Sequence, residues 1–297
     1  MAFTASDVKD LRERTGCGMM DCKKALTEAN GDMDKAIEFL REKGLAAAAK
    51  KSSRIASEGL VVSIVEGNVG VVLEVNAETD FVAKNADFVT FVNNVAKTII
   101  KENPADIAAL NDMTCVGTEM TVAEALREKI LVIGENMNIR RFERLEGALV
   151  PYVHGGGKIG VMVQFDTDCT GYEACGKDVA MQVAAAFPQF LSKDEVPAET
   201  VAKEKEILTA QAINEGKPAA IAEKMVNGRI AKYYKEVCLL EQAFIKDDDI
   251  SVAKYVENTA KELGGNLTLK KFVRFEKGEG LEKREDNFAD EVASMVK

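Results

Sequence analysis

The stretch Val69-Gly70-Val71-Val72-Leu73-Glu74-Val75 decides how this chain is organised, because a matching stretch follows ninety positions later. That second stretch reads Ile159-Gly160-Val161-Met162-Val163-Gln164-Phe165. A glycine-containing turn precedes each of them, at Gly67-Asn68 and at Gly157-Lys158. Two apolar runs joined by such a turn predict a β-hairpin. The sequence therefore predicts two hairpins built on one pattern.

A second pair of matching segments closes each copy. Residues Gly134–Arg144 align with Gly264–Arg274, at an offset of 130 instead of ninety, so the second copy carries an insertion of forty residues. Each copy reads as a hairpin, then helices, then a third strand. Two copies are too few for a solenoid. We therefore predict an α+β fold whose core is a duplicated pair of lobes with antiparallel sheets.

The two copies differ directly after the hairpin. The first copy continues as Asn76-Ala77-Glu78-Thr79-Asp80-Phe81-Val82, whereas the second has Thr170-Gly171 in place of Asp80-Phe81. Because the second copy repeats the framework without Asp80-Phe81, the framework does not require this pair. A purely structural explanation for the pair is therefore weakened. Two interpretations remain open. Either Phe81 is a core residue and Asp80 a helix cap, as a lone aromatic usually suggests, or the pair contacts a partner.

Smaller helical segments are predicted outside the duplicated core. Residues 1–45 read as three short helices, of which the third ends at Gly44, and residues 46–57 read as a linker that is helical at its start. Apolar spacing and a turn signal in the insertion predict two antiparallel helices. The predicted divisions are a three-helix module at 1–45, a linker at 46–57, core lobes at 58–146 and 147–277, a helical hairpin at about 192–232 within the second lobe, and a module with a short C-terminal helix at 278–297.

Composition excludes several classes of function. A net charge of −10 argues against direct binding to nucleic acid as the main activity. No apolar run reaches transmembrane length and the start lacks a signal sequence, which predicts a cytoplasmic protein without a membrane partner. A single histidine and six cysteines without a Cys-x-x-Cys pair argue against a zinc site. Without a nucleophile, base and acid set, we expect a binding protein that is not an enzyme and needs no cofactor.

Several side chains outside the Asp80-Phe81 pair are candidates for contact or reactivity. Exposed methionine adapts to contact surfaces, although methionine on a helix is more often core. The lone histidine, beside a glycine-rich turn, is either a contact residue or a catalytic base. Two cysteines flank a helix start, where a reactive thiol is an alternative to a buried one. The residues concerned are Arg12, Met19, Met20 and Lys23 at the first helix break, Cys17 and Cys22 beside them, His154, and Met295 on an apolar C-terminal stripe.

Three long segments make the chain resemble the translation elongation factor Ts family. They are Leu11–Leu26, Glu74–Asn85 and Ile133–Arg141, and the likeness extends over nearly the whole chain. The resemblance implies a guanine-nucleotide exchange factor that binds the GDP form of elongation factor Tu, a GTPase, and promotes GDP release and GTP loading. It also implies a ubiquitin-associated-like fold for the first module and a coiled coil for the inserted hairpin.

The resemblance implies a contact role for particular residues as well. The segment Thr79-Asp80-Phe81-Val82 is expected to touch the nucleotide domain of the GTPase, where the phenylalanine inserts between helices and disturbs the magnesium and phosphate environment. The other implied contacts are Ile133 and Gly134 to the same domain, His154 to the far domain, Val237 in the second lobe, Met295 in the tail, and Arg12, Met19, Met20 and Lys23 in the first module.

Two questions stay open at the level of sequence. An adaptor that binds partners through its three-helix module alone is the alternative function, and it predicts that Phe81 is dispensable. The sequence also leaves open whether the chain forms a homodimer or a two-to-two complex with its partner.

Overall fold

The chain is described here by a computed structural model that covers residues 3–15, 17–216 and 218–283, without the side chains of 219–224. It divides into two compact units. Of the residues that the structure describes, those up to Val62, Leu73–Arg144 and 275–283 form the first unit, and Ser63–Val72 with Leu145–Arg274 form the second. The tip of the first hairpin therefore belongs to the second unit, where the Ser63 hydroxyl donates to the Val161 carbonyl oxygen over 2.7 Å.

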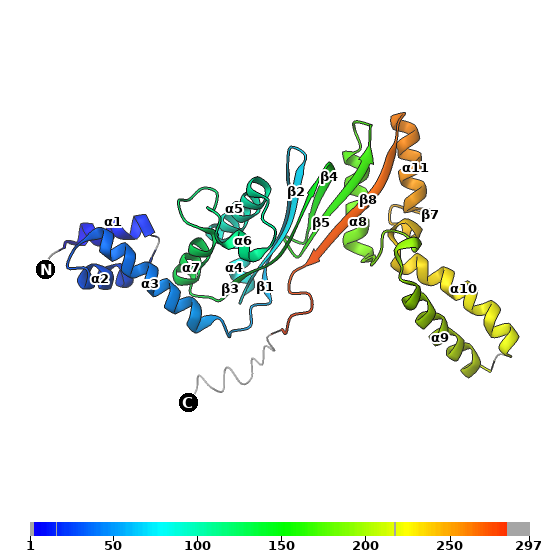
Figure 1. Ribbon diagram of the computed structural model, residues 1–297, viewed down its shortest axis with the longest axis horizontal. Coiled ribbons are helices and arrows are strands. Elements are labelled where there is room, and N and C mark those ends of the chain that lie inside the picture. The colour runs from blue at the N-terminus through cyan, green and yellow to red at the C-terminus, as the bar shows by residue number, and fades with distance from the viewer. Residues whose placement is uncertain (1–2, 16, 217, 284–297) are drawn as a thin grey trace. The chain divides into compact units, whose positions relative to one another are not determined.

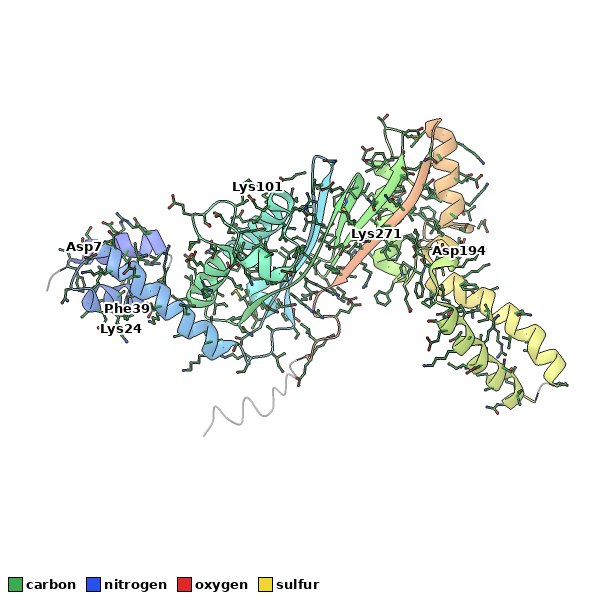
Figure 2. All side chains as sticks on the ribbon, in the orientation of Figure 1. Asp7, Lys24, Phe39, Lys101, Asp194 and Lys271 are labelled. Carbon is green, nitrogen blue, oxygen red and sulfur yellow. The ribbon has the colours of Figure 1, made fainter. Side chains whose placement is uncertain are left out.

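The N-terminal module consists of α1 (Ala5–Thr15), α2 (Met19–Glu28) and α3 (Met33–Lys51). A capping box begins α1, because the Thr4 amide donates to Asp7 over 2.6 Å and the Asp7 amide donates to Thr4 Oγ1. Figure 2 labels Asp7 on this helix. Apolar side chains at helical spacing close a small core between the three helices. They are Val8, Leu11, Cys17, Cys22, Ala25, Leu26, Ala36 and Leu40.

The third helix does not end at Gly44, so that prediction was wrong. Gly44 is buried in the middle of α3, which packs on α7 (Val122–Ile133). A Cβ at this position would already touch the backbone of Arg127 and the side chain of Leu131. The glycine therefore permits close approach of two helices and does not cap one, and the helix continues through the alanine-rich residues that follow.

The first repeat forms a three-stranded sheet in the order β1-β2-β3, as the sequence predicts. Nearly every residue of β2 is buried, so both faces of this strand are covered. The apolar stripe of α5 is buried, beginning with Phe88 and Phe91. The elements are β1 (Glu58–Glu66), β2 (Val69–Ala77), α4 (Asp80–Ala83), α5 (Ala86–Glu102), α6 (Ile107–Asn111), α7, and β3 (Met137–Glu146).

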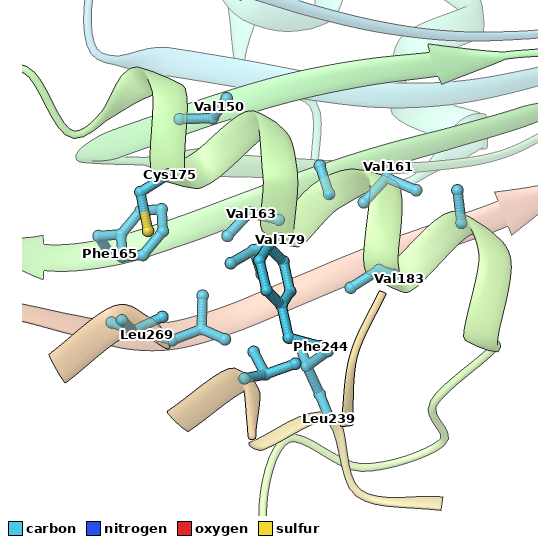
Figure 3. Packing of buried hydrophobic residues seen from close by; sticks show 14 of the residues in the cluster. Val150, Val161, Val163, Phe165, Cys175, Val179, Val183, Leu239, Phe244 and Leu269 are labelled. Carbon is cyan, nitrogen blue, oxygen red and sulfur yellow. The ribbon is translucent and has the colours of Figure 1, made fainter. Parts of the chain in front are cut away.

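The second repeat forms a sheet in the order β4-β5-β8, which confirms the duplication. Its antiparallel hairpin pairs Ala148 with Phe165 at one end and His154 with Ile159 at the other. Side chains from β4, β5, β8, α8 and α11 interlock with Leu239 and Phe244 in one apolar core, in which Val179 and Phe244 lie near the centre (Figure 3). The elements are β4 (Ala148–His154), β5 (Ile159–Thr167), α8 (Glu173–Ala186), α11 (Val252–Leu263) and β8 (Leu267–Glu276).

The insertion in the second repeat is a pair of helices, α9 (Ala198–Asn214) and α10 (Ala219–Val237), which pack against each other. Figure 1 shows them as a hairpin extending from the second unit. Short elements surround the base of the hairpin. These are the 3-10 helices η1 (Lys193–Glu195) and η2 (Leu239–Glu241) and the strands β6 (Ala243–Phe244) and β7 (Asp247–Ser251).

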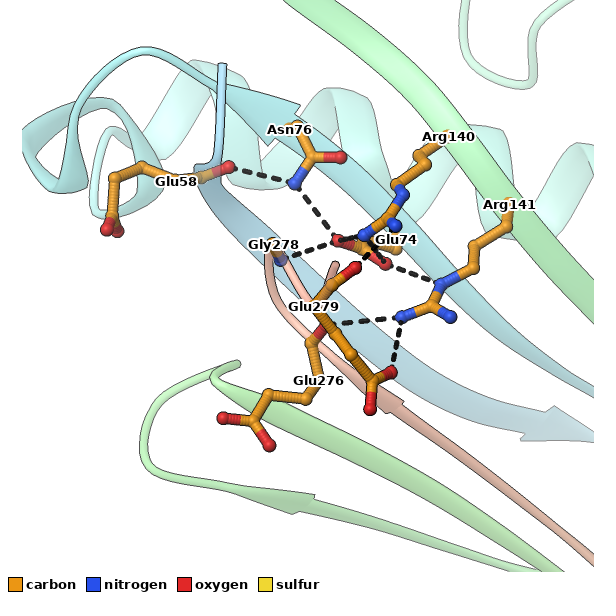
Figure 4. A network of polar contacts seen from close by, with 8 residues as sticks. All are labelled: Glu58, Glu74, Asn76, Arg140, Arg141, Glu276, Gly278 and Glu279. Carbon is orange, nitrogen blue, oxygen red and sulfur yellow. Dashed lines mark hydrogen bonds and ion pairs between the residues drawn. The ribbon is translucent and has the colours of Figure 1, made fainter. Parts of the chain in front are cut away.

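A buried carboxylate fastens the segment after β8 to the first unit (Figure 4). Glu74, on β2, has no exposed surface and accepts from Arg140 Nη1 at 3.0 Å and from Arg141 Nε at 2.6 Å. The Gly278 amide donates to the same carboxylate over 2.8 Å. Gly278 has φ +67°, and a Cβ there would lie 2.2 Å from the Ser57 carbonyl oxygen, so only glycine fits.

The predicted C-terminal helix, which contains Met295, lies outside the described residues. Among the helices that are described, none has both the length and the apolar character needed to cross a membrane.

Candidate functional site

Phe81 lies on the surface, with 80% of the residue exposed, although it follows a strand that is almost wholly buried. It is the second residue of α4, and its neighbour Val82 faces inward and anchors this short helix. Thr79 caps the helix, because its side chain accepts from the Val82 amide. The interpretation of Phe81 as core and Asp80 as cap was therefore wrong. Exposing so large an aromatic costs solvation free energy that a partner can recover.

Asp80 stands beside Phe81 and carries a negative charge at neutral pH. Lys84 Nζ lies 2.7 Å from Asp80 Oδ2, one helical turn further along the chain. This hydrogen bond holds the pKa of Asp80 below its ordinary value. Because both side chains are largely exposed, the pair adds little stability and can open to another cation.

Glu135 holds the segment that carries Phe81, and we name this contact the Glu135 clasp. Its carboxylate accepts from the Thr79 amide at 3.0 Å, the Thr79 hydroxyl at 2.7 Å and the Glu78 amide at 3.1 Å. A reciprocal bond runs from the Asn136 amide to Glu78 Oε1 at 2.6 Å. The sequence interpretation missed Glu135; the aligned glycine in the second copy, Gly265, was the signal that could have found it.

The clasp also brings two of the predicted contact segments together. Gly134 ends α7 in a left-handed conformation, φ +87°, and Ile133 is the last residue of that helix. The next residue is Glu135, so the turn at Ile133-Gly134 is tied by hydrogen bonds to Thr79. Residues 79–82 and 133–134, which are more than fifty positions apart, therefore belong to one local surface of the first unit.

The candidates in the N-terminal module lie at the surface around the start of α2. Met19 is 60% exposed and Met20 is 73% exposed, whereas Leu26 on the same helix is buried. Arg12 and Lys23 are exposed as well. Helical methionine normally packs inward, so two neighbouring exposed methionines form a small apolar patch flanked by cations.

Of the remaining candidates, His154 and Val237 lie on different elements of the second unit. His154 is exposed at the end of β4, where Nδ1 lies 3.1 Å from the Tyr152 hydroxyl oxygen. Val237 ends α10 and is only 8% exposed; it packs with Val196 and Cys238 in a small core and presents little side-chain surface to a partner. Met295 lies outside the described residues.

Cysteine chemistry and metal binding receive little support from the geometry. Burial raises the pKa of the Cys17 and Cys22 thiols, which disfavours the reactive thiolate at the helix start. All six cysteines are free, and only Cys169 is partly exposed. Within the described ranges, no group of three or more His, Cys, Asp or Glu side chains could hold a metal ion.

Comparison with known proteins gives a consistent result. A family model described as "Elongation factor TS" matches residues 78–279. An elongation factor Ts of Syntrophotalea carbinolica is 55% identical over 303 aligned positions that span all of both chains. The elongation factors Ts of Clostridium kluyveri and Clostridium perfringens are each 55% identical over 99% of both chains. The likeness therefore runs through both units and the N-terminal module.

Proposed function

This chain belongs to the elongation factor Ts family, and from that premise we propose that it is the guanine-nucleotide exchange factor of elongation factor Tu. It binds the GDP form of this GTPase, speeds GDP release and leaves the nucleotide site open for GTP. The observation that carries the proposal is Phe81, a large aromatic that is 80% exposed on a segment held by three hydrogen bonds.

The proposed mechanism is a competition between nucleotide and exchange factor for the same GTPase. Whatever the factor does to nucleotide affinity, the nucleotide does to the affinity for the factor. Phe81 enters the nucleotide domain of the partner and disturbs the magnesium ion and phosphate contacts that hold GDP. Because the magnesium ion neutralises phosphate charge, its displacement weakens phosphate binding.

The energies show what Phe81 can supply. Release that is a thousand-fold faster needs about 4 kcal/mol of destabilisation if all of it appears in the off-rate. Burying one phenylalanine is worth roughly 1.5–3 kcal/mol, and a central aromatic hot spot roughly 2–4 kcal/mol. Phe81 therefore supplies much of the required energy, and the remaining contacts must hold the complex while it enters.

The direct test is a nucleotide-release assay. Purified elongation factor Tu is loaded with a fluorescent GDP, and the decay of its signal is followed with excess GDP, with and without this chain. We expect release to accelerate and then saturate with increasing chain concentration. Binding without any acceleration, lost on changes to Met19 and Met20 but not to Phe81, would favour the adaptor function instead.

Replacing Asp80 by alanine is expected to have a smaller effect than changes at Phe81. The exposed pair with Lys84 is worth roughly 0.2–1 kcal/mol, so the fold should keep nearly all of its stability. Loss of the charge should slow association more than it slows release at saturation. Urea unfolding and the concentration dependence of release measure the two effects. An unfolded Asp80→Ala protein would show that the residue is structural after all.

The double substitution Met19→Ala, Met20→Ala is expected to weaken binding of the GTPase about tenfold without lowering the saturating release rate. Both side chains are exposed, so the module should remain folded. Burying a methionine at an interface is worth roughly 1.5–3 kcal/mol when it is complete. The half-saturating concentration in the release assay reports the change. Lys24→Ala, on the same helix, is the matched control. An equal rise in its half-saturating concentration would show that the effect is not specific to the two methionines.

A further inference from the structure

We infer that Glu135 is a positioning residue for exchange: it holds α4 in place so that Phe81 is presented in a fixed direction. This inference rests on the proposed function and adds to it a residue that touches no nucleotide. Its side chain reaches Thr79, the cap of α4, from a turn 56 positions further along the chain.

The helix α4 is too short to be stable without contacts from elsewhere in the chain. α4 has only four residues, far below the length at which a helix is stable alone. A capping box needs a carboxylate or amide three residues after the cap, and α4 has Val82 there. The Glu135 carboxylate takes that part from outside, because it accepts from both the amide and the hydroxyl of Thr79.

A comparison within the same unit shows the usual arrangement. Thr121 caps α7, and Glu124, three residues later, accepts from the Thr121 amide at 2.9 Å and from its hydroxyl at 3.2 Å. The bonding pattern matches that of Glu135 with Thr79. The local sequence therefore closes α7, whereas α4 depends on a residue distant in sequence for the same bonds.

The second repeat keeps one part of this contact, the bond between Glu78 and Asn136, and lacks the other part, the bonds between Glu135 and Thr79. Asp168, which aligns with Glu78, accepts from the Asn266 amide at 2.7 Å, just as Glu78 accepts from Asn136. The residue aligned with Glu135 is Gly265, and a Cβ there would lie 2.6 Å from Cys169 Sγ. The fold thus keeps the Glu78 bond in both copies, but has the glutamate clasp only where Phe81 also occurs.

The consequence is mechanical. Phe81 can distort the nucleotide pocket of the partner only if α4, which carries it, is held rigidly. If α4 could move, its displacement would relieve the strain that insertion of Phe81 imposes on the pocket. Without the clasp, Phe81 would remain exposed and could still bind, but in a spread of directions. Release at saturation should therefore fall more than affinity does.

The test compares four full-length proteins in the release assay: the unchanged chain, Glu135→Ala, Phe81→Ala and the double variant. We expect Glu135→Ala to lower the saturating rate about tenfold and to change the half-saturating concentration less than threefold. In the Phe81→Ala background it should lower the rate less than twofold, because a residue that acts through Phe81 has nothing left to position. Glu135→Gln, which keeps one oxygen acceptor, should lie between.

A partner-free readout and a matched control accompany the cycle. Amide hydrogen exchange at residues 78–82 should become at least tenfold faster in Glu135→Ala, while α5 keeps its protection. Glu124→Ala loses the equivalent bonds on α7 and should leave both residues 78–82 and the saturating rate unchanged. Full multiplication of the two rate losses in the double variant, or unchanged exchange at 78–82, overturns the inference. Failure of the unchanged chain to speed release would instead overturn the proposed function, and amide exchange would still decide whether Glu135 holds α4.

Discussion

Replacing Phe81 by alanine is expected to lower the saturating rate of GDP release by about 30- to 1,000-fold. The range converts a hot-spot loss of roughly 2–4 kcal/mol at about 1.4 kcal/mol for each factor of ten. The ring is mostly in solvent in the free chain, so its removal takes little from the core. Thermal and urea unfolding should therefore be almost unchanged, which separates loss of function from loss of fold.

Two comparisons sharpen this prediction. Phe81→Leu keeps an apolar side chain of smaller volume and should recover part of the rate. Phe187→Ala removes another exposed phenylalanine, which lies under the Arg274 guanidinium in the second unit, and should leave release unchanged. Normal release by a folded Phe81→Ala protein would contradict the mechanism in which Phe81 enters the nucleotide domain of the partner.

Replacing Glu74 by alanine is expected to cost roughly 3–5 kcal/mol of unfolding free energy in the first unit. Removing the buried member of an ion pair takes the main counter-charge from its partners, although Arg141 keeps a contact to Glu279 at 3.1 Å. Here two guanidinium groups, Arg140 and Arg141, and the Gly278 amide lose their common acceptor (Figure 4). Guanidinium-induced unfolding followed by hydrogen exchange in β2 and β3 measures the loss.

A partly exposed acid near the same segment provides the control. Glu58 pairs with Lys277, but its side chain is 38% exposed. Glu58→Ala should therefore cost less than about 1 kcal/mol. Equal costs for the two variants would show that burial of Glu74 does not set the strength of its contacts.

The same network predicts how stability depends on pH. Burial alone would raise the pKa of Glu74, but hydrogen bonds from Gly278, Asn76 and Arg141 outweigh it, and the pKa lies below its ordinary value of 4.5. A group whose pKa falls on folding stabilises the native state above its unfolded pKa and loses that contribution as the pH drops through the folded value. Unfolding free energy should fall below about pH 4.5, and less steeply in Glu74→Gln.

The sequence predicted those features that depend on local pattern or on internal repetition. The hairpins, the third strands and the inserted helices follow from apolar spacing, and the missing Asp80-Phe81 pair in the second copy pointed to the surface position of Phe81. The comparison of the two copies identified Phe81 because both repeats form the same framework. A residue that occurs in only one of them is therefore not required by that framework.

Other features depend on residues that only the fold brings together. Glu135 and Thr79 are 56 positions apart, and Glu74 and Gly278 are 204 positions apart, so no local pattern reveals their bonds. Gly44 was misread because glycine favours helix ends in isolation, whereas here its lack of a side chain admits α7. At Gly44, a tertiary contact thus overrode a local propensity.

The most direct measurement of the central claim uses the fluorescence of a Phe81→Trp variant. The chain has no tryptophan, so a single indole at position 81 reports this site alone once the signal of the partner is subtracted. If Phe81 enters the nucleotide domain, emission should begin at the wavelength of a solvent-exposed indole and shift to the blue on binding of GDP-loaded elongation factor Tu, in step with GDP release. An emission maximum that stays at the solvent-exposed wavelength while release proceeds at saturation would contradict the account.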